Sequence, residues 1–370
     1  MDWMIAALLV AGFVALMLGA EILVRGASRL AAAVGISPLV IGLTVVAFGT
    51  SAPELAINLQ SAFTGQGSIA LGNVVGSNIM NVLVILGLSA LIIPLVVNQQ
   101  LVRQDVPIMI AITLLAWWMA SDGMIDRLDG FILFAGLAIY LVFSIVQSRK
   151  ETSIEVREEY EQEYAEKEKH TPRSIAINIG QIVVGLVGLT FGADWLVDGA
   201  VRLAQIFNVS ELVIGLTIVA IGTSLPELAT SIVAAIRKER DIAVGNVVGS
   251  NIFNLMAVLG LTGLISPNGI PIPAPALAFD IPVMVAVAVI TLPIFFTGGH
   301  MIHRWEGGLF VALYALYIGV MLSDASGATA YQDDATRVII FITGLVLAGS
   351  ILHEVIYRRR RKPIPERSRP

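Results

Sequence analysis

The sequence lacks cysteine and has few charged residues. With no cysteine among its 370 residues, the chain cannot form disulfides or use thiol chemistry, and cysteine usage gives no indication of the redox compartment. Only 14% of the residues are charged, whereas soluble proteins carry about 25%. Hydrophobic residues make up 56% and the mean hydropathy is +0.83. These proportions exclude an ordinary soluble domain and indicate a polytopic membrane protein. We expect membrane lipid around it and no nucleic-acid partner.

Apolar runs of about 20 residues, each long enough to cross about 30 Å of hydrocarbon, recur along the whole chain. We expect an all-α protein with eleven transmembrane helices, near residues 4–31, 37–63, 68–95, 104–120, 128–147, 174–205, 211–236, 241–265, 277–297, 305–322 and 337–357. The first run is expected to be a permanent span, because a cleavable signal peptide needs a basic start that Met1-Asp2-Trp3 does not provide.

The first half of the chain recurs in the second half. The string GNVVGSNI occurs at residues 72–79 and again, unchanged, at 245–252. The segment GTSAPE at 49–54 recurs as GTSLPE at 222–227, at the same offset of 227 − 54 = 173. Eight identical residues in a fixed frame indicate an internal duplication. Five spans per copy is an odd number, so we expect an inverted-topology repeat of 5+5 helices with its site at the midplane between the halves.

We expect five units along the chain. Residues 1–147 form the first repeat, 148–173 a charged cytoplasmic linker, 174–322 the second repeat, 323–357 an extra helix with its preceding loop, and 358–370 a basic cytoplasmic tail. The linker is dense in glutamate, which is typical of a solvated helix. A regulatory Ca²⁺ site is the alternative, but the linker lacks an EF-hand pattern.

Basic residues near the span ends predict the orientation in the membrane. One side collects most of them: Arg25, Arg29, Arg103, Arg149, Lys150, Arg237, Lys238, Arg240, Arg304 and the cluster 358–362. The opposite side has few, beside acids such as Asp122 and Asp126. We therefore expect a multi-pass protein of the inner (cytoplasmic) membrane, with the N-terminus outside and the C-terminus in the cytoplasm.

Glu54 and Glu227 lie inside the second and seventh apolar runs. An ionised carboxylate at mid-membrane depth costs about 2.5–3.5 kcal/mol and usually marks an ion or proton path. The alternative, a protonated glutamate bonded between helices, is disfavoured because the two acids occupy matched positions. A proline and a glycine beside each acid interrupt the helix and leave backbone groups that need protein, water or an ion.

The remaining polar groups in these two segments are all oxygen donors. They are the carbonyls of Ala47 and Ala220, which we expect to be unwound, and the hydroxyls of Thr50, Ser51, Thr223 and Ser224. Hard cations such as Ca²⁺ take six to eight oxygen ligands, and nothing in this set is soft. The residues therefore favour a site for Na⁺ or Ca²⁺.

The third span of each half adds further oxygen donors. They are Ser77 and Asn81 in the first half, matched by Ser250 and Asn254 in the second. Residues four apart share one helix face, and an amide oxygen can bind a cation without adding charge. Asn78 lies on another face and could instead cap broken backbone. The glycines of GNVVGSN are expected to serve close helix packing.

The doubled GTS-x-PE and GSN-I-x-N blocks resemble the repeats of the cation/Ca²⁺ exchanger superfamily, and most closely the prokaryotic sodium/calcium exchangers. The resemblance covers about 320 residues. It implies that Glu54 and Glu227 hold Ca²⁺ together with the carbonyls of Thr50 and Thr223. It implies Na⁺ sites at Ala47, Ser51 and Ser77 in one half and at Ala220, Ser224 and Ser250 in the other. Asn81 and Asn254 would line the middle.

Some relatives carry an aspartate where this chain has Asn81 or Asn254. Asparagine at both positions argues against K⁺ co-transport, and the Gly-Asn-Ala-Thr-Glu motif of proton-coupled relatives is absent. We therefore expect a Ca²⁺/Na⁺ antiporter with no cofactor and no enzymatic activity. An H⁺/Ca²⁺ exchanger on the same scaffold, a passive cation channel and an intramembrane enzyme are the alternatives, in falling order. The long first and sixth spans, rich in glycine and alanine, are expected to slide and alternate access.

Overall fold

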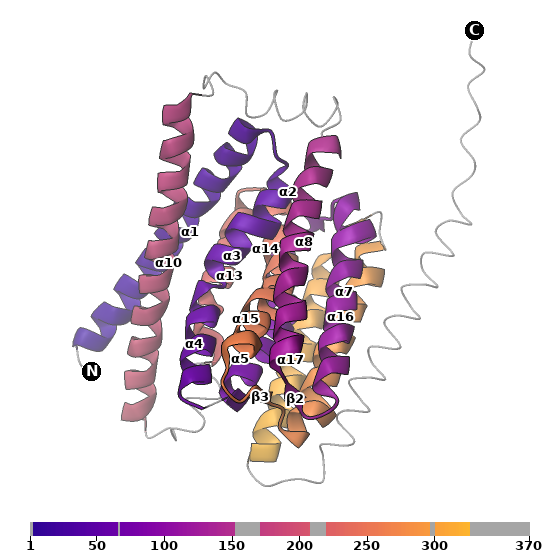
Figure 1. Cartoon of the computed structure of the whole chain (residues 1–370). Helices are drawn as coiled ribbons and strands as arrows, with labels where there is room; N and C mark the ends of the chain where they lie inside the picture. The colour runs from indigo at the N-terminus through magenta and orange to yellow at the C-terminus, as the bar shows by residue number, and fades with distance from the viewer. Residues whose placement is uncertain (1–2, 66, 152–170, 208–219, 297–299, 326–370) are drawn as a thin grey trace.

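The computed structural model describes residues 3–65, 67–151, 171–207, 220–296 and 300–325, and almost all of them are helical (Figure 1). The first half contains α1 (Trp3–Val34), α2 (Pro38–Ile41), η1 (Gly42–Val46), α3 (Ala47–Thr50), α4 (Ala52–Phe63), α5 (Gly67–Met80), η2 (Asn81–Leu86), α6 (Gly87–Ile92), β1 (Leu95–Val96), η3 (Leu101–Asp105), α7 (Val106–Ala120), β2 (Met124–Ile125) and α8 (Arg127–Glu151). The second half contains α10 (Pro172–Ile206), α12 (Ala220–Gly222), α13 (Leu225–Ile236), α14 (Arg240–Phe253), η5 (Asn254–Leu259), α15 (Gly260–Ile265), β3 (Ile270–Pro271), η6 (Ala276–Asp280), α16 (Ile281–Phe296), β4 (Met301–Ile302) and α17 (Arg304–Ala325). Elements labelled η are π-helical turns.

Helices occupy ten of the eleven expected spans. Within the described residues, seven helices are long and apolar enough to cross a membrane, and the bent pair formed by Pro38–Thr50 and Ala52–Phe63 makes an eighth. The multi-pass membrane architecture is therefore confirmed. The eleventh predicted span, 337–357, lies outside the described residues, as do residues 211–219 of the seventh span, most of the linker and the basic tail.

The second span breaks at Ser51, where its two parts meet at an angle of 44°. Ser51 has a non-helical backbone, and Pro53 sits in the first turn of α4. The second half repeats this arrangement with Ser224 before α13 and Pro226 in its first turn. Proline is tolerated in a first helical turn because the backbone N–H there has no helical partner. The predicted interruption is therefore confirmed in both halves.

The third spans of the two halves form the centre of the bundle. In the span α14–η5–α15 every residue of the most apolar stretch is buried, and in α5–η2–α6 72% are buried. The corresponding share is only 28% in α8 and in α10. Large side chains such as Ile139 and Phe191 are 72% and 54% exposed, which fits helices that face lipid. The site residues therefore lie at the core.

Helices α1 and α10 lie side by side at one edge of the bundle and run obliquely to each other (Figure 1). Their backbones approach so closely at the glycines that no side chain fits between them. A Cβ atom added to Gly19 would lie 2.7 Å from the backbone nitrogen of Leu189, and one added to Gly192 would lie 2.5 Å from that of Leu16. Small residues permit this kind of close helix contact in membranes. The pairing of the first and sixth spans is therefore present.

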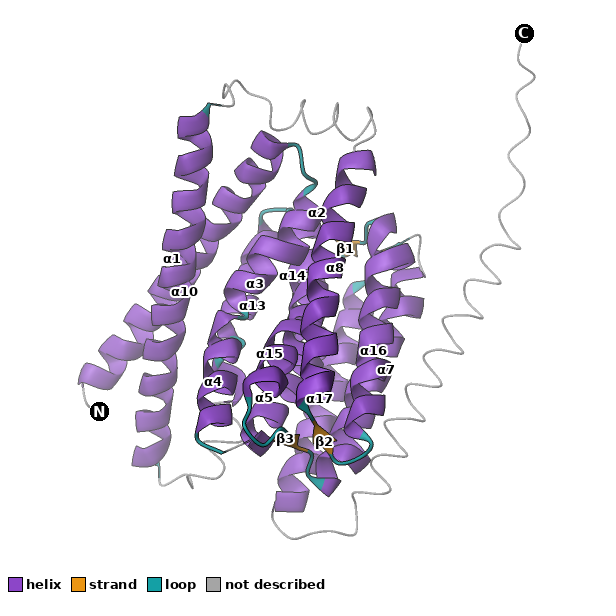
Figure 2. Cartoon of the chain, viewed as in Figure 1, coloured by secondary structure: helices purple, strands orange, loops and turns teal. Residues whose placement is uncertain are grey.

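Two antiparallel ribbons connect the halves at opposite ends of the bundle (Figure 2). Strand β1 of the first half pairs with β4 of the second. At the other end, β2 of the first half pairs with β3 of the second. In each ribbon, one strand follows the third span of one copy, and the other strand precedes the fifth span of the other copy. This reciprocal exchange is what a two-fold relation between the copies produces.

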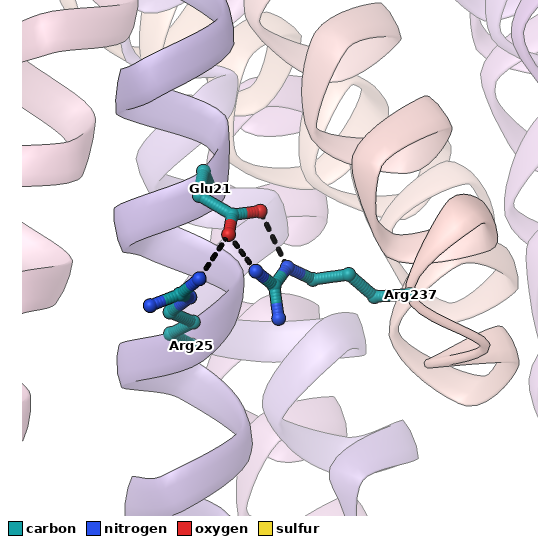
Figure 3. A network of polar contacts seen from close by, with 3 residues as sticks. All are labelled: Glu21, Arg25 and Arg237. Atoms are coloured by element: carbon teal, nitrogen blue, oxygen red, sulfur yellow. Dashed lines mark hydrogen bonds and ion pairs between the residues drawn. The ribbon is translucent and has the colours of Figure 1, made fainter.

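One polar network ties α1 to the C-terminal end of α13 (Figure 3). Glu21 contacts Arg237 through both carboxylate oxygens, and it also contacts Arg25 at 2.6 Å, one turn along α1. Nearby, the Ser28 hydroxyl donates to Glu239 at 2.9 Å. At the offset of 173, the position of Arg237 is occupied in the first half by Thr64, which carries no charge. This network therefore has no charged equivalent at the repeat-related position.

Candidate functional site

Glu54 and Glu227 lie in the centre of the protein and are 0% and 1% exposed. Each is the third residue of the helix that begins after the break, in the first turn of α4 and of α13. The N-terminus of a helix carries partial positive charge, which favours a carboxylate in its first turn. The broken backbone therefore both places the acids at the core and partly compensates their negative charge.

The serine at each break bonds to the glutamate of the other half. The Ser224 hydroxyl donates to Glu54 Oε1 at 3.1 Å, and the Ser51 hydroxyl donates to Glu227 Oε1 at 3.0 Å. Ser224 precedes Glu227 by three residues, and Ser51 precedes Glu54 by three. The two breaks therefore face each other across the centre of the protein.

Two asparagines hold the broken segments in place. Asn246 Nδ2 donates to the Glu227 carbonyl at 3.3 Å and to the Ser231 hydroxyl at 2.9 Å, and its Oδ1 accepts from the Thr50 hydroxyl at 3.1 Å. Asn73 makes the matching set, to the Glu54 carbonyl at 3.4 Å, to Asn58 Oδ1 at 2.7 Å and from the Thr223 hydroxyl at 3.4 Å. Each asparagine therefore joins the second and seventh spans of the chain to the third span of its own half.

Asn81 and Asn254 are buried at the start of the π-helical turns η2 and η5. Turns of this kind are frequent at functional sites. Asn81 Nδ2 donates to Asn251 Oδ1 at 3.2 Å, and Asn254 Nδ2 donates to Asn78 Oδ1 at 3.1 Å. Turn η2 packs on α13 and η5 packs on α4. Each asparagine therefore lies next to the helix that carries the glutamate of the other half.

Five buried oxygens at this centre have no hydrogen-bond partner among the described residues. They are Glu54 Oε2, Glu227 Oε2, Asn81 Oδ1, Asn254 Oδ1 and Ser250 Oγ. A buried polar atom that lacks a partner costs about 1–3 kcal/mol, and more if it is charged. All five are hard oxygen donors, and two belong to acids. Such a set suits a hard cation and supplies two negative charges to neutralise it.

Several details differ from the predictions. Ala47 was expected to have an unwound carbonyl, but this oxygen accepts the Ser51 N–H at 3.0 Å and the Thr50 hydroxyl at 3.3 Å, because α3 stays helical until the break. In the second half, the matching N–H group, that of Ser224, donates to the carbonyl of Ile221 at 3.1 Å. This hydrogen bond therefore does not use the carbonyl of Ala220, the counterpart of Ala47.

The third-span residues also depart from expectation. Asn78 does not cap the broken backbone, because its side chain bonds to Asn254 and Met284, whereas Asn73 and Asn246 bond to the first turns of the helices after the breaks. Ser77 accepts from Ser224 at 3.2 Å, whereas its counterpart Ser250 has no such partner within the described residues. The two halves of the site are therefore similar but not identical.

Asn73, Asn246 and the pair Asn58 and Ser231 were missed as site residues, although the sequence carries a signal for them. Asn73 and Asn246 lie in the doubled string GNVVGSNI, and Asn58 matches Ser231 at the offset of 173. In both copies, an asparagine lies in the apolar third span at the same sequence separation from the glutamate. Such a polar residue is a reasonable site candidate. Only the folded chain shows that these residues bond to the broken segments.

The chain is similar to known proteins over most of its length. A family model described as sodium/calcium exchanger protein matches residues 4–146 and 177–323. The inner membrane protein YrbG of Escherichia coli (strain K12) is 40% identical over 266 residues, which are 71% of this chain and 81% of YrbG. The sodium/calcium exchanger MaX1 of Methanosarcina acetivorans is 32% identical over 343 residues, which are 85% of this chain and 97% of MaX1.

Among solved structures, the sodium-calcium exchanger NCX_Mj, soaked with zero Na⁺ and Ca²⁺, superposes with a TM-score of 0.74. The two chains are 31% identical, and the match covers 87% of this chain and 100% of that one. The family model spans both halves of the chain and includes the two broken segments and the doubled asparagine blocks. This chain is therefore a member of the sodium/calcium exchanger family.

Proposed function

We propose that the protein is a secondary active antiporter that exchanges Ca²⁺ for Na⁺ across the cytoplasmic membrane. The observation that carries this proposal is the group of five unpartnered buried oxygens at the centre of the bundle, two of them from acids. The relatives named for sodium/calcium exchange support the identity of the two ions. Glu54 and Glu227 would bind the ion directly, with Asn81 and Asn254 completing the centre. The carbonyls of Thr50 and Thr223 would contribute to the same site.

The flanking positions are proposed to take Na⁺. Their residues are Ala47, Ser51 and Ser77 in one half and Ala220, Ser224 and Ser250 in the other. Because Ser51 and Ser224 each bond to a glutamate, an ion beside them would compete with a hydrogen bond to the carboxylate. The carbonyl of Ala47 accepts two hydrogen bonds, and the Thr50 hydroxyl would have to turn away before this oxygen could bind Na⁺.

Charge balance explains why such a site exchanges ions rather than leaking them. Two ionised glutamates neutralise one Ca²⁺ or two Na⁺, so both loaded states are close to neutral. The empty state would bury two unpaired negative charges, which is heavily penalised. The site would therefore move through the occluded state only when it is loaded, and one ion must replace the other.

Alternating access is assigned to α1 and α10. Their backbones come into close contact at several glycines, and they lie at the edge of the bundle (Figure 1). The pair would slide as a unit over the central spans, and the contacts of Glu21 with Arg237 would have to change during that movement. The inverted repeat provides a passage to each side of the membrane in turn.

The proposed orientation places the β1–β4 end of the bundle in the cytoplasm. Arg304 donates to the Ile92 carbonyl beside this ribbon, and α14, which follows the Arg237 loop, also contacts β1. Arg25 lies within reach of Glu21 in the same network as Arg237. The basic residues thus gather at one end, and the positive-inside rule places that end in the cytoplasm. The N-terminus would then be outside.

Flux measurements in vesicles that contain the full chain test the proposal. We expect an imposed Na⁺ gradient to drive ⁴⁵Ca²⁺ uptake, and an imposed pH gradient without Na⁺ to drive none. Glu54→Gln and Glu227→Gln should each abolish uptake, because each removes one of the two charges that balance Ca²⁺.

A matched control is Glu306→Gln. Glu306 is also buried, but it accepts from the backbone of His303 at the start of α17, away from the site. This variant should transport normally. Uptake driven by pH alone would favour proton exchange, and uptake with no counter-ion gradient would indicate a channel. Near-normal Na⁺-driven uptake by Glu54→Gln would refute the assigned site.

A further inference from the structure

Two methionine sulfurs lie against the asparagines behind the proposed ion site. Asn251 Nδ2 approaches Met109 Sδ at 3.5 Å, and Asn78 Nδ2 approaches Met284 Sδ at 3.7 Å. Met109 on α7 and Met284 on α16 are both almost fully buried. Their positions are related by the repeat, since 284 − 109 = 175 is also the offset between Asp105 and Asp280. The same contact is therefore present once in each half.

The four side chains also line one small cavity of about 10 Å³. A cavity needs about 10–15 Å³ to hold a single water molecule, so this space cannot take a hydrated cation. The methionines therefore contact the asparagines in a space too small for a hydrated cation. The methionines can therefore affect the orientation of the asparagine amides, and they do not bind the cation themselves.

The chemistry of the sulfur fixes the direction of each amide. A thioether can only accept a hydrogen bond, whereas an amide has a donating end and an accepting end. Met109 therefore holds the N–H end of Asn251, and the oxygen of Asn251 faces Asn81. Asn81 must then present its own N–H end to Asn251. Its oxygen is left unpartnered and available to a cation.

Met284 produces the same sequence of contacts in the other half. It holds the N–H end of Asn78, whose oxygen accepts from Asn254, so the Asn254 oxygen is also left unpartnered. Without this restraint the amides could rotate by half a turn at little steric cost. The free oxygens of Glu54 and Glu227 would attract the amide N–H groups, and a rotated amide would then point donors, not acceptors, towards a cation.

We propose that Met109 and Met284 are positioning residues that keep the amide oxygens of Asn81 and Asn254 directed at the transported cation. This inference rests on the proposed function only in taking Ca²⁺ as the ion. Two soft, uncharged sulfur atoms that never touch the cation would then contribute to the affinity of the site for that cation.

Leucine replaces methionine with nearly the same volume but removes the acceptor, and such exchanges usually cost under about 1.5 kcal/mol of stability. If the two orientations of an amide pair become equally populated, half of the molecules keep the binding geometry. Apparent affinity falls by the competent fraction. We therefore expect Met109→Leu and Met284→Leu each to raise the Ca²⁺ dissociation constant about twofold, and the double variant to raise it about fourfold.

The test measures Ca²⁺ binding to the purified full chain by titration calorimetry, together with the unfolding temperature in the absence of ions and the KM and kcat of uptake in vesicles. A positioning role requires the Kd and KM to rise while kcat and the ion-free unfolding temperature stay unchanged. Met119→Leu is the matched control, because Met119 is also buried on α7 but its sulfur accepts no hydrogen bond from the described residues. It should leave all four quantities unchanged.

An unchanged Kd in the double variant would overturn the inference, as would a rise in Kd accompanied by an equal rise for Met119→Leu or by a lower ion-free unfolding temperature. Because binding is measured without transport, the two proposals can fail separately. A wild-type protein that binds Ca²⁺ but shows no Na⁺-driven uptake would refute the exchange function, and the methionine variants would still be judged on their Kd. A wild-type protein that binds no Ca²⁺ would refute both.

Discussion

Replacing Asn246 by alanine should destabilise the protein and weaken the site together. The change removes three buried hydrogen bonds, to the Thr50 hydroxyl, the Glu227 carbonyl and the Ser231 hydroxyl. Hydrogen bonds between membrane helices average about 0.6 kcal/mol each and reach about 1.7 kcal/mol. We therefore expect a loss of about 2 kcal/mol in the free energy of unfolding. Asn73→Ala, its counterpart, should lose about the same or slightly less, because two of its three contacts are long, at 3.4 Å.

The assay is unfolding of the purified chain in mixed micelles by a denaturing detergent, with and without Ca²⁺. The control is Thr262→Val on α15, in the same span as Asn246. Thr262 is fully buried, but its hydroxyl has no partner among the described residues, so its loss should cost little. A change under about 0.5 kcal/mol for Asn246→Ala, or a loss for Thr262→Val as large as that for Asn246→Ala, would refute the reasoning.

Two further predictions concern the contacts of α1. Gly192→Ala should lower the unfolding temperature and slow Na⁺-driven Ca²⁺ uptake, because an added Cβ would collide with the backbone of α1 and overpacking costs about 1–3 kcal/mol. Gly180→Ala on the same helix, where an added Cβ meets nothing within 4 Å, should be neutral or slightly stabilising, and equal behaviour of the two variants would contradict this account. Arg237→Gln should change stability by less than about 1 kcal/mol, because its pair with Glu21 is about one-third exposed and exposed ion pairs contribute little. Thermal unfolding at low and high salt checks this, and a much larger, salt-independent loss would show that the pair is structural.

The duplication made much of the site predictable. Glu54 and Glu227 could be identified from sequence because an acid inside an apolar run has few explanations, and a matched second acid leaves fewer. The breaks at Ser51 and Ser224 followed from proline and glycine, whose effect on a helix is local. The helical spans followed from length and hydropathy alone.

The contacts between the halves could not be predicted in the same way. Ser51 bonds to Glu227 rather than to Glu54 because the copies face each other across the centre, and this depends on the packing of the whole bundle. Asn78 and Asn251 follow the same rule, since each pairs with the asparagine of the other copy. The Ala47 carbonyl was mispredicted because a proline reveals that a helix is interrupted nearby but not at which residue the last helical bond ends.

The hydrogen bonds that cross between the copies have a consequence for biosynthesis. Glu54 is made 227 − 54 = 173 residues before Glu227, and its hydroxyl partner Ser224 emerges almost as late. At about 5–20 residues per second, translation needs roughly 9–35 s to supply them. During that interval the first half must sit in the bilayer with an acid whose partner does not yet exist. A ribosome that stops after the first five helices would therefore leave Glu54 without the serine that bonds it in the complete chain.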